Sequence, residues 1–202
     1  MDVLVLLDDC NDDAVLGRTG RTDGARPLAY VHWVPVDADD VAFGRPTGAG
    51  GREVVTLCGD ADADRLAVAL AAAVEGHRAT APGMPGAVRH LGVWADAGAS
   101  GDVAWRDQAT GQLQSRDVDI PAADVEATAR RLLAECGAVI RQTAAKLAMP
   151  DWPEGVRRAI SFTFDAPADL LPARAALAGG TGDGLLALLR EADGYYDADD
   201  GF

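Results

Sequence analysis

The sequence predicts an α+β fold, a two-layer sandwich in which a mixed or antiparallel sheet carries its helices on one face. The first observation is an amphipathic helix between Pro121 and Met149, where apolar or small side chains recur every three or four residues. These positions are Val125, Ala129, Leu132, Leu133, Cys136, Val139, Ile140, Thr143 and Leu147. The second observation is the segment after this helix, where Ile160, Phe162 and Phe164 alternate with small or hydroxyl side chains. Together they indicate a helix on one side of a sheet whose other side is more polar.

Three strands are expected before the first helix. Residues 1–7 are a short apolar run, which is typical of a buried strand. Leu28–Val36 is rich in β-branched and aromatic residues, and Pro35 indicates that this strand ends nearby or lies at an edge. A glycine- and proline-containing loop at Phe43–Gly51 separates it from the third strand at Glu53–Cys58.

The remaining elements begin with a helix whose start is marked by acidic residues. Asp60, Asp62 and Asp64 suit N-terminal capping and the positive end of the helix dipole. The elements expected besides the long helix and its strand are a helix, a strand, two hairpin strands and a last helix, at residues 65–75, 89–95, 103–105, 113–120 and 185–192.

The order of these elements predicts a topology. The short strand at residues 103–105 is counted together with its hairpin partner. From the third strand onward the order is then strand, helix, strand, strand, helix, strand, which is the order of a ferredoxin-like βαββαβ core. The extra N-terminal strands would widen its sheet. No repeat or shift in composition divides the chain, so residues 1–192 are expected to form a single domain and residues 193–202 an acidic, mobile tail.

The charge of the chain narrows the class of partner. The formal net charge is −14 at pH 7, from 18 basic and 32 acidic residues. Nucleic-acid binding needs clustered Lys and Arg to displace counterions, and anionic lipids would be repelled. The longest apolar stretch, Leu66–Val74, is also far below the ~18 residues of a membrane span. Neither nucleic acid nor a membrane is therefore expected as a partner. A basic protein or an extended peptide is the partner that such a surface attracts.

The cysteines predict the compartment. Cys10, Cys58 and Cys136 are an odd number at wide spacings, which indicates neither a disulfide framework nor a metal-binding pair. The apolar start of the chain has no basic segment of the kind that opens a signal peptide. A reducing, cytoplasmic location is therefore expected.

Oxygen-bearing side chains gather directly after the first strand. Converging carboxylates can bind Mg²⁺ or Ca²⁺, so the candidate metal ligands are Asp8, Asp9, Asn11, Asp12 and Asp13. A calcium loop would need glycine where Ala14 stands and glutamate where Gly20 stands. A solvated acidic loop is the simpler interpretation, and no metal or cofactor is expected.

The histidines are the candidate catalytic residues. His32 and His90 fall within expected strands and His77 near the end of a helix. If their strands are neighbours, Cys58 could form a nucleophile–base dyad with His32 or His90. Histidines that pack singly in the sheet are the alternative, and their spacing carries no metal signature.

Several segments resemble the HORMA adaptor domains. Leu28–Tyr30, leading to Pro35, looks like the exit of their early helix, and the segment Thr110–Ile120 looks like their central hairpin. Val139–Gln142 and Ser161–Asp165 look like their last helix and strand. The family opens with a long helix, which residues 1–27 do not supply. The resemblance implies an adaptor that clasps a partner peptide under a mobile C-terminal segment.

Two classes of function follow. The first hypothesis is a non-catalytic protein-interaction module with an acidic surface, since no catalytic motif is assembled in the sequence. The alternative is a cofactor-independent small-molecule enzyme with a pocket between sheet and helix, in which His32 or His90 is the acid–base. A peptide-clasping adaptor of the HORMA kind is a further alternative, and the oligomeric state stays open.

Overall fold

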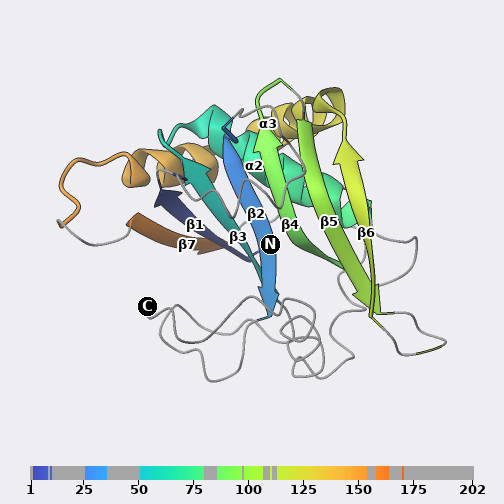
Figure 1. Ribbon diagram of the computed structural model, residues 1–202. Coiled ribbons are helices and arrows are strands. Elements are labelled where there is room, and N and C mark those ends of the chain that lie inside the picture. The colour runs from blue at the N-terminus through green and yellow to red at the C-terminus, as the bar shows by residue number, and fades with distance from the viewer. Residues whose placement is uncertain are drawn as a thin grey trace.

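The computed structural model of the chain shows an α+β fold built on a mixed seven-stranded sheet (Figure 1). The residues described are 2–8, 10, 26–35, 51–79, 86–96, 98–106, 110, 113–153, 158–163 and 170. Within these ranges, two helices pack against each other on the same face of the sheet. The α+β class and the placement of the helices on one face are confirmed.

The elements follow one another along the chain nearly as predicted. They are β1 (Asp2–Asp8), β2 (Ala29–Pro35), β3 (Gly51–Cys58), α2 (Ala63–Arg78), β4 (Gly86–Trp94), β5 (Gly98–Arg106), β6 (Leu113–Ile120), α3 (Ala122–Leu147) and β7 (Arg158–Thr163). The short strand expected at residues 103–105 is longer, because β5 pairs with both β4 and β6 along nearly all of its length. The helix expected at residues 185–192 and the tail at 193–202 lie outside the described residues.

The order of strands in the sheet is β6-β5-β4-β2-β3-β1-β7. β1 runs parallel to β3, with Val5 opposite Val55, and the other neighbouring strands are antiparallel. The ferredoxin-like topology is not confirmed, because β1 and β2 do not widen the sheet at an edge. β2 lies between β3 and β4, β1 lies between β3 and β7, and three strands separate α2 from α3 along the chain.

Both helices are fixed at their ends by side chains. At the start of α2, the carboxylate of Asp62 accepts a hydrogen bond from the backbone N–H of Arg65 (2.8 Å), as the acidic residues there predicted. At the end of α3, Trp152 Nε1 donates to the carbonyl of Lys146 (3.0 Å). Arg158, the first residue of β7, donates to the carbonyl of Leu147 (3.2 Å). These contacts satisfy carbonyls that the helix itself leaves without a donor.

The two faces of the sheet differ in what covers them. Val5, Val31 and Val55 lie on the face under the helices and belong to the hydrophobic core, together with the buried side of α2. Because side chains alternate along a strand, Tyr30 and His32 lie on the opposite face. We call that opposite side the open face, since neither α2 nor α3 covers it (Figure 1).

Candidate functional site

The open face carries both candidate catalytic histidines. His32 lies on β2 and His90 on β4, which are neighbouring antiparallel strands, and each histidine adjoins a core residue that points to the helices. The ring of Tyr30 stacks on that of His90, with centroids 5.4 Å apart and planes 26° apart. The structure therefore brings the histidines to one face, but to the face away from the helices. A pocket between sheet and helix would not contain them.

Acidic residues follow His90 across the open face toward β6. His90 lies opposite Asp102 on β5, Asp102 lies opposite Asp117 on β6, and Ser100 lies opposite Asp119. We call Ser100, Asp102, Asp117 and Asp119 the acidic strip. Neighbouring strands lie about 4.8 Å apart, so the strip places Asp102 and Asp117 side by side on this face.

Exposure increases along this path toward the edge of the sheet. Tyr30 is only 5% exposed, His90 and Asp102 are half-buried, and Asp117 and Asp119 are exposed. Among the described strands, none pairs with the outer side of β6. The acidic strip is thus reachable by a partner both from the open face and along the β6 edge.

A backbone feature of β5 shapes this site. β4 has an irregularity in register between Val88 and His90, where β5 passes it. Gly101 lies opposite Leu91 there with a φ of +154°, and a Cβ at Gly101 would overlap the backbone oxygen of His90. Only glycine allows the two strands to approach in this way, which fixes the position of His90.

The face under the helices contains a polar pair that the sequence reasoning missed. Glu53 of β3 is 0% exposed and His77 of α2 is 7% exposed, and Oε1 of Glu53 and Nε2 of His77 lie 2.6 Å apart. The neighbouring Glu75 accepts from Thr128 of α3 (2.5 Å) and from Arg78 (2.8 Å). These hydrogen bonds join β3, α2 and α3 at one end of the core, so their role is to satisfy buried polar groups.

The signals for the Glu53–His77 pair are visible in the sequence afterwards. Glu53 is in phase with Val55 and Leu57, so its side chain points into the core. His77 follows Leu66 and Leu70 at helical spacing on the buried side of α2. A glutamate in phase with core residues requires a partner, and the histidine on the facing helix stripe supplies it.

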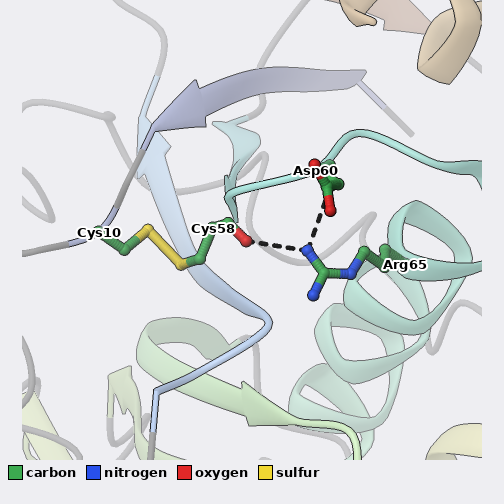
Figure 2. Close-up of a disulfide and its surroundings, with 4 residues drawn as sticks. All are labelled: Cys10, Cys58, Asp60 and Arg65. Carbon is green, nitrogen blue, oxygen red and sulfur yellow. Dashed lines mark hydrogen bonds between the residues drawn. A yellow bond between two sulfur atoms is a disulfide. The ribbon is translucent and has the colours of Figure 1, made fainter.

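Two cysteines form a disulfide, so the expectation that the cysteines do not pair was wrong for Cys10 and Cys58. Their Cα atoms are 5.2 Å apart although 48 positions separate them in sequence (Figure 2). Cys58 ends β3, opposite Asp8 at the end of β1, and Cys10 follows two residues later. Parallel neighbouring strands place their carboxyl ends at the same edge of the sheet, which brings the two sulfurs together. Cys136, on α3, forms no disulfide and packs against the core.

An open pocket of about 270 Å³ lies beside the disulfide. It is lined by Cys10, Arg26, Pro27, Leu28, Cys58, Gly59, Arg65 and Ala95. Arg65, in the first turn of α2, donates from Nη1 to the carbonyl of Cys58 (2.9 Å) and to that of Asp60 (3.4 Å), as Figure 2 shows. Its Nε lies 3.8 Å from the carboxylate of Asp62. We call this site the disulfide pocket.

Of the candidate metal ligands, only Asp8 lies within the described residues. Asp8 is the last residue of β1, and its backbone oxygen accepts from Gly59 N–H (2.8 Å). Asp9, Asn11, Asp12 and Asp13 lie outside the described residues. Within the described ranges, no three His, Cys, Asp or Glu side chains are grouped closely enough to hold a metal ion. A Cys58–His dyad is replaced by the disulfide, which occupies the Cys58 sulfur.

The fold and these two sites define an α+β protein with three aspartates on strands β5 and β6 and a disulfide pocket at the carboxyl ends of β1 and β3. Comparisons with protein-family models, with curated proteins and with solved structures found no match. Neither α2 nor α3 combines the length and the apolar character that crossing a membrane requires. The segment likened to the exit of the HORMA helix, Leu28–Tyr30, leads directly into strand β2.

Proposed function

We propose that this chain is a protein-interaction module that binds a basic, extended segment of a partner protein on the acidic strip. The observation that carries the proposal is the placement of Asp102, Asp117 and Asp119 on one face of adjacent strands β5 and β6. Cations of a partner that lie over the strip would form ion pairs with its exposed carboxylates, Asp117 and Asp119.

The surroundings of the strip support a basic partner. The net charge of −14 steers cationic molecules toward the chain, and the strip concentrates part of that charge at a sheet edge. An extended segment can add to β6 through backbone hydrogen bonds while its basic side chains reach the aspartates.

Binding of an arginine–serine repeat peptide tests this proposal. Replacing Asp117→Asn and Asp119→Asn together should weaken its binding about tenfold, from two rim ion pairs of about 0.7 kcal/mol each. The matched control is Glu126→Gln with Asp151→Asn, which removes two exposed charges outside the strip. Affinity is measured by fluorescence anisotropy at two salt concentrations. An equal loss in both double variants would indicate attraction to the overall charge and contradict a site.

A small-molecule enzyme is a second candidate, which the opposition of His90 and Asp102 favours. A carboxylate beside an imidazole can orient it for proton transfer. A thermal-shift screen of small molecules against the wild type and His90→Gln tests this function. A ligand whose stabilisation disappears in His90→Gln but persists in Asp117→Asn would support an enzyme over an interaction module.

The cysteines bear on the cellular compartment in which the chain works. The cytoplasmic location stays a prediction from the sequence, while the Cys10–Cys58 disulfide favours an oxidising compartment. We propose that the chain works where this bond is formed. Acid quenching and alkylation of thiols in intact cells checks this: two alkylated cysteines in place of a disulfide would favour the reducing cytoplasm.

A further inference from the structure

The disulfide pocket gathers features that a purely structural crosslink does not require. Both cysteines are half-buried and line a pocket of about 270 Å³, so their sulfurs can be approached from solvent. Arg26 and Arg65 line the same pocket, in a chain whose net charge is −14. We propose that the Cys10–Cys58 bond is a thiol–disulfide exchange site that reacts with a small anionic thiol entering this pocket.

The charges around the pocket select the reactant. The overall field of the protein repels anions, whereas the described residues that line the pocket include two arginines and no carboxylate, which favours an anion there. The N-terminus of α2, where Arg65 lies, adds a partial positive charge. Asp62 pairs with the Nε side of Arg65 at 3.8 Å, while Nη1 is directed at the carbonyl of Cys58. Cationic, partly exposed surroundings favour thiolates, both attacking and departing.

The two cysteines are held differently, which sets the direction of attack. Cys58 is fixed without the disulfide: its N–H donates to Leu28 (3.0 Å), its carbonyl accepts from Arg65, and it ends a paired strand. Cys10 lies beyond the end of β1 in a left-handed conformation with a φ of +50°, which is costly for a residue other than glycine. Once the bond opens, Cys10 can relax and Cys58 keeps its place.

The reaction balances with two equivalents of thiol. The incoming thiolate attacks Sγ of Cys10 and forms a new S–S bond, while the Cys10–Cys58 bond breaks and its electron pair leaves on Cys58 as a thiolate in the pocket that Arg65 also lines. A second thiolate attacks the sulfur of the first, which releases Cys10. The protein gains two electrons and, from solvent, two protons, and the thiol is oxidised to its disulfide. Arg65 is a positioning residue, since it binds the carbonyl of Cys58 and places a positive charge in the pocket lining.

Reduction rates with two probe thiols test this proposal on the full chain. Mercaptoethanesulfonate is anionic and cysteamine is cationic, and reduction of the native protein is followed by maleimide gel shift. Relative to the intrinsic reactivity of each probe toward a neutral disulfide, the anionic thiol should react about tenfold faster than the cationic one. Arg26→Gln and Arg65→Gln should each reduce that preference severalfold, and Arg65→Lys should restore it. Arg130→Gln, which removes an exposed cation on α3, should leave it unchanged.

Mass spectrometry of the quenched reaction gives the second readout. The mixed disulfide should be on Cys10, with Cys58 recovered as the alkylated thiol, and the reduced protein should keep its native circular dichroism. Reduction that occurs only in denaturant would overturn the exchange site and leave a structural crosslink. An adduct on Cys58, or a charge preference that both arginine variants leave intact, would likewise contradict it.

Discussion

The two faces of the sheet are built from the same strands but differ in the burial of their side chains. Under the helices, valines and leucines of β1 to β4 meet the alanine-rich side of α2, and the polar pair Glu53–His77 is enclosed and hydrogen-bonded. On the open face, Tyr30, His90 and the acidic strip form a path that becomes more exposed toward β6. Packing and the hydrogen bond of the polar pair account for the first face, and neither requires the three aspartates of the second.

This difference separates residues that maintain the fold from residues that are available for binding. Changes under the helices should lower the free energy of unfolding, because they leave cavities or polar groups without partners. Changes on the acidic strip should leave that free energy nearly constant and alter binding instead. Each prediction below tests this separation.

The largest expected effect is on the buried pair. Glu53→Ala leaves His77 in the core without its 2.6 Å partner, so the free energy of unfolding should fall by about 3–5 kcal/mol in urea denaturation. Glu135→Ala, which removes an exposed ion pair with Arg131 on α3, should cost less than about 0.5 kcal/mol. A loss below about 1 kcal/mol for Glu53→Ala would show that the pair does not help to hold this face together.

The disulfide lies at the edge of the open face and should have the next largest effect. It closes a loop over 48 positions, and a crosslink of that length stabilises by about 2–4 kcal/mol. Cys10→Ser with Cys58→Ser should therefore unfold at lower urea by that amount, and wild-type protein in excess reductant should match it. If the variant and the oxidised wild type unfold at the same urea concentration, the crosslink contributes nothing to stability.

A smaller effect is expected at the inner end of the acidic path. A double-mutant cycle with Tyr30→Leu and His90→Leu should give a coupling energy of about 0.5–1.5 kcal/mol for the stacked rings. The measurement is again urea denaturation of the four proteins. Additive single changes would mean that the rings touch without stabilising each other.

The smallest effect on stability is expected at the outer end. Asp117→Asn with Asp119→Asn should change the free energy of unfolding by no more than about 0.5 kcal/mol, since both residues are exposed. Neutralising two carboxylates in a chain of net charge −14 reduces its self-repulsion, so a slight gain in the free energy of unfolding is expected. A destabilisation above about 1 kcal/mol would assign these residues to the fold and remove the distinction between the faces.

Much of the local structure was predictable because it depends on short-range periodicity. The helical spacing from Val125 to Leu147 predicted α3, and the alternation at Ile160 and Phe162 predicted β7. Strand order was not predictable in the same way. It depends on pairings such as Val5 with Val55 and with Ile160, which are distant in sequence and leave no local pattern.

For the sites, too, some residues could be chosen from the sequence, whereas their convergence depends on strand pairing. His32 and His90 could be chosen from the sequence, but their common face follows from the placement of β2 beside β4. The disulfide was missed for the same reason: Cys10 and Cys58 each lie at a strand end, and only the parallel pairing of β1 and β3 makes those ends meet. Arg26 and Arg65 belong to no sequence motif. They are brought together only by the fold, as residues that line the disulfide pocket.

The position of β1 between β3 and β7 has a consequence for synthesis on the ribosome. Among the described strands of the sheet β1 is translated first, whereas its antiparallel neighbour β7 emerges roughly 150 residues later. At about 5–20 residues per second, one side of β1 waits roughly eight to thirty seconds for the strand that completes it. During that interval β1, β2 and β3 can already pair with one another. The nascent chain therefore presents an apolar strand edge to its surroundings until Ile160 and Phe162 leave the exit tunnel.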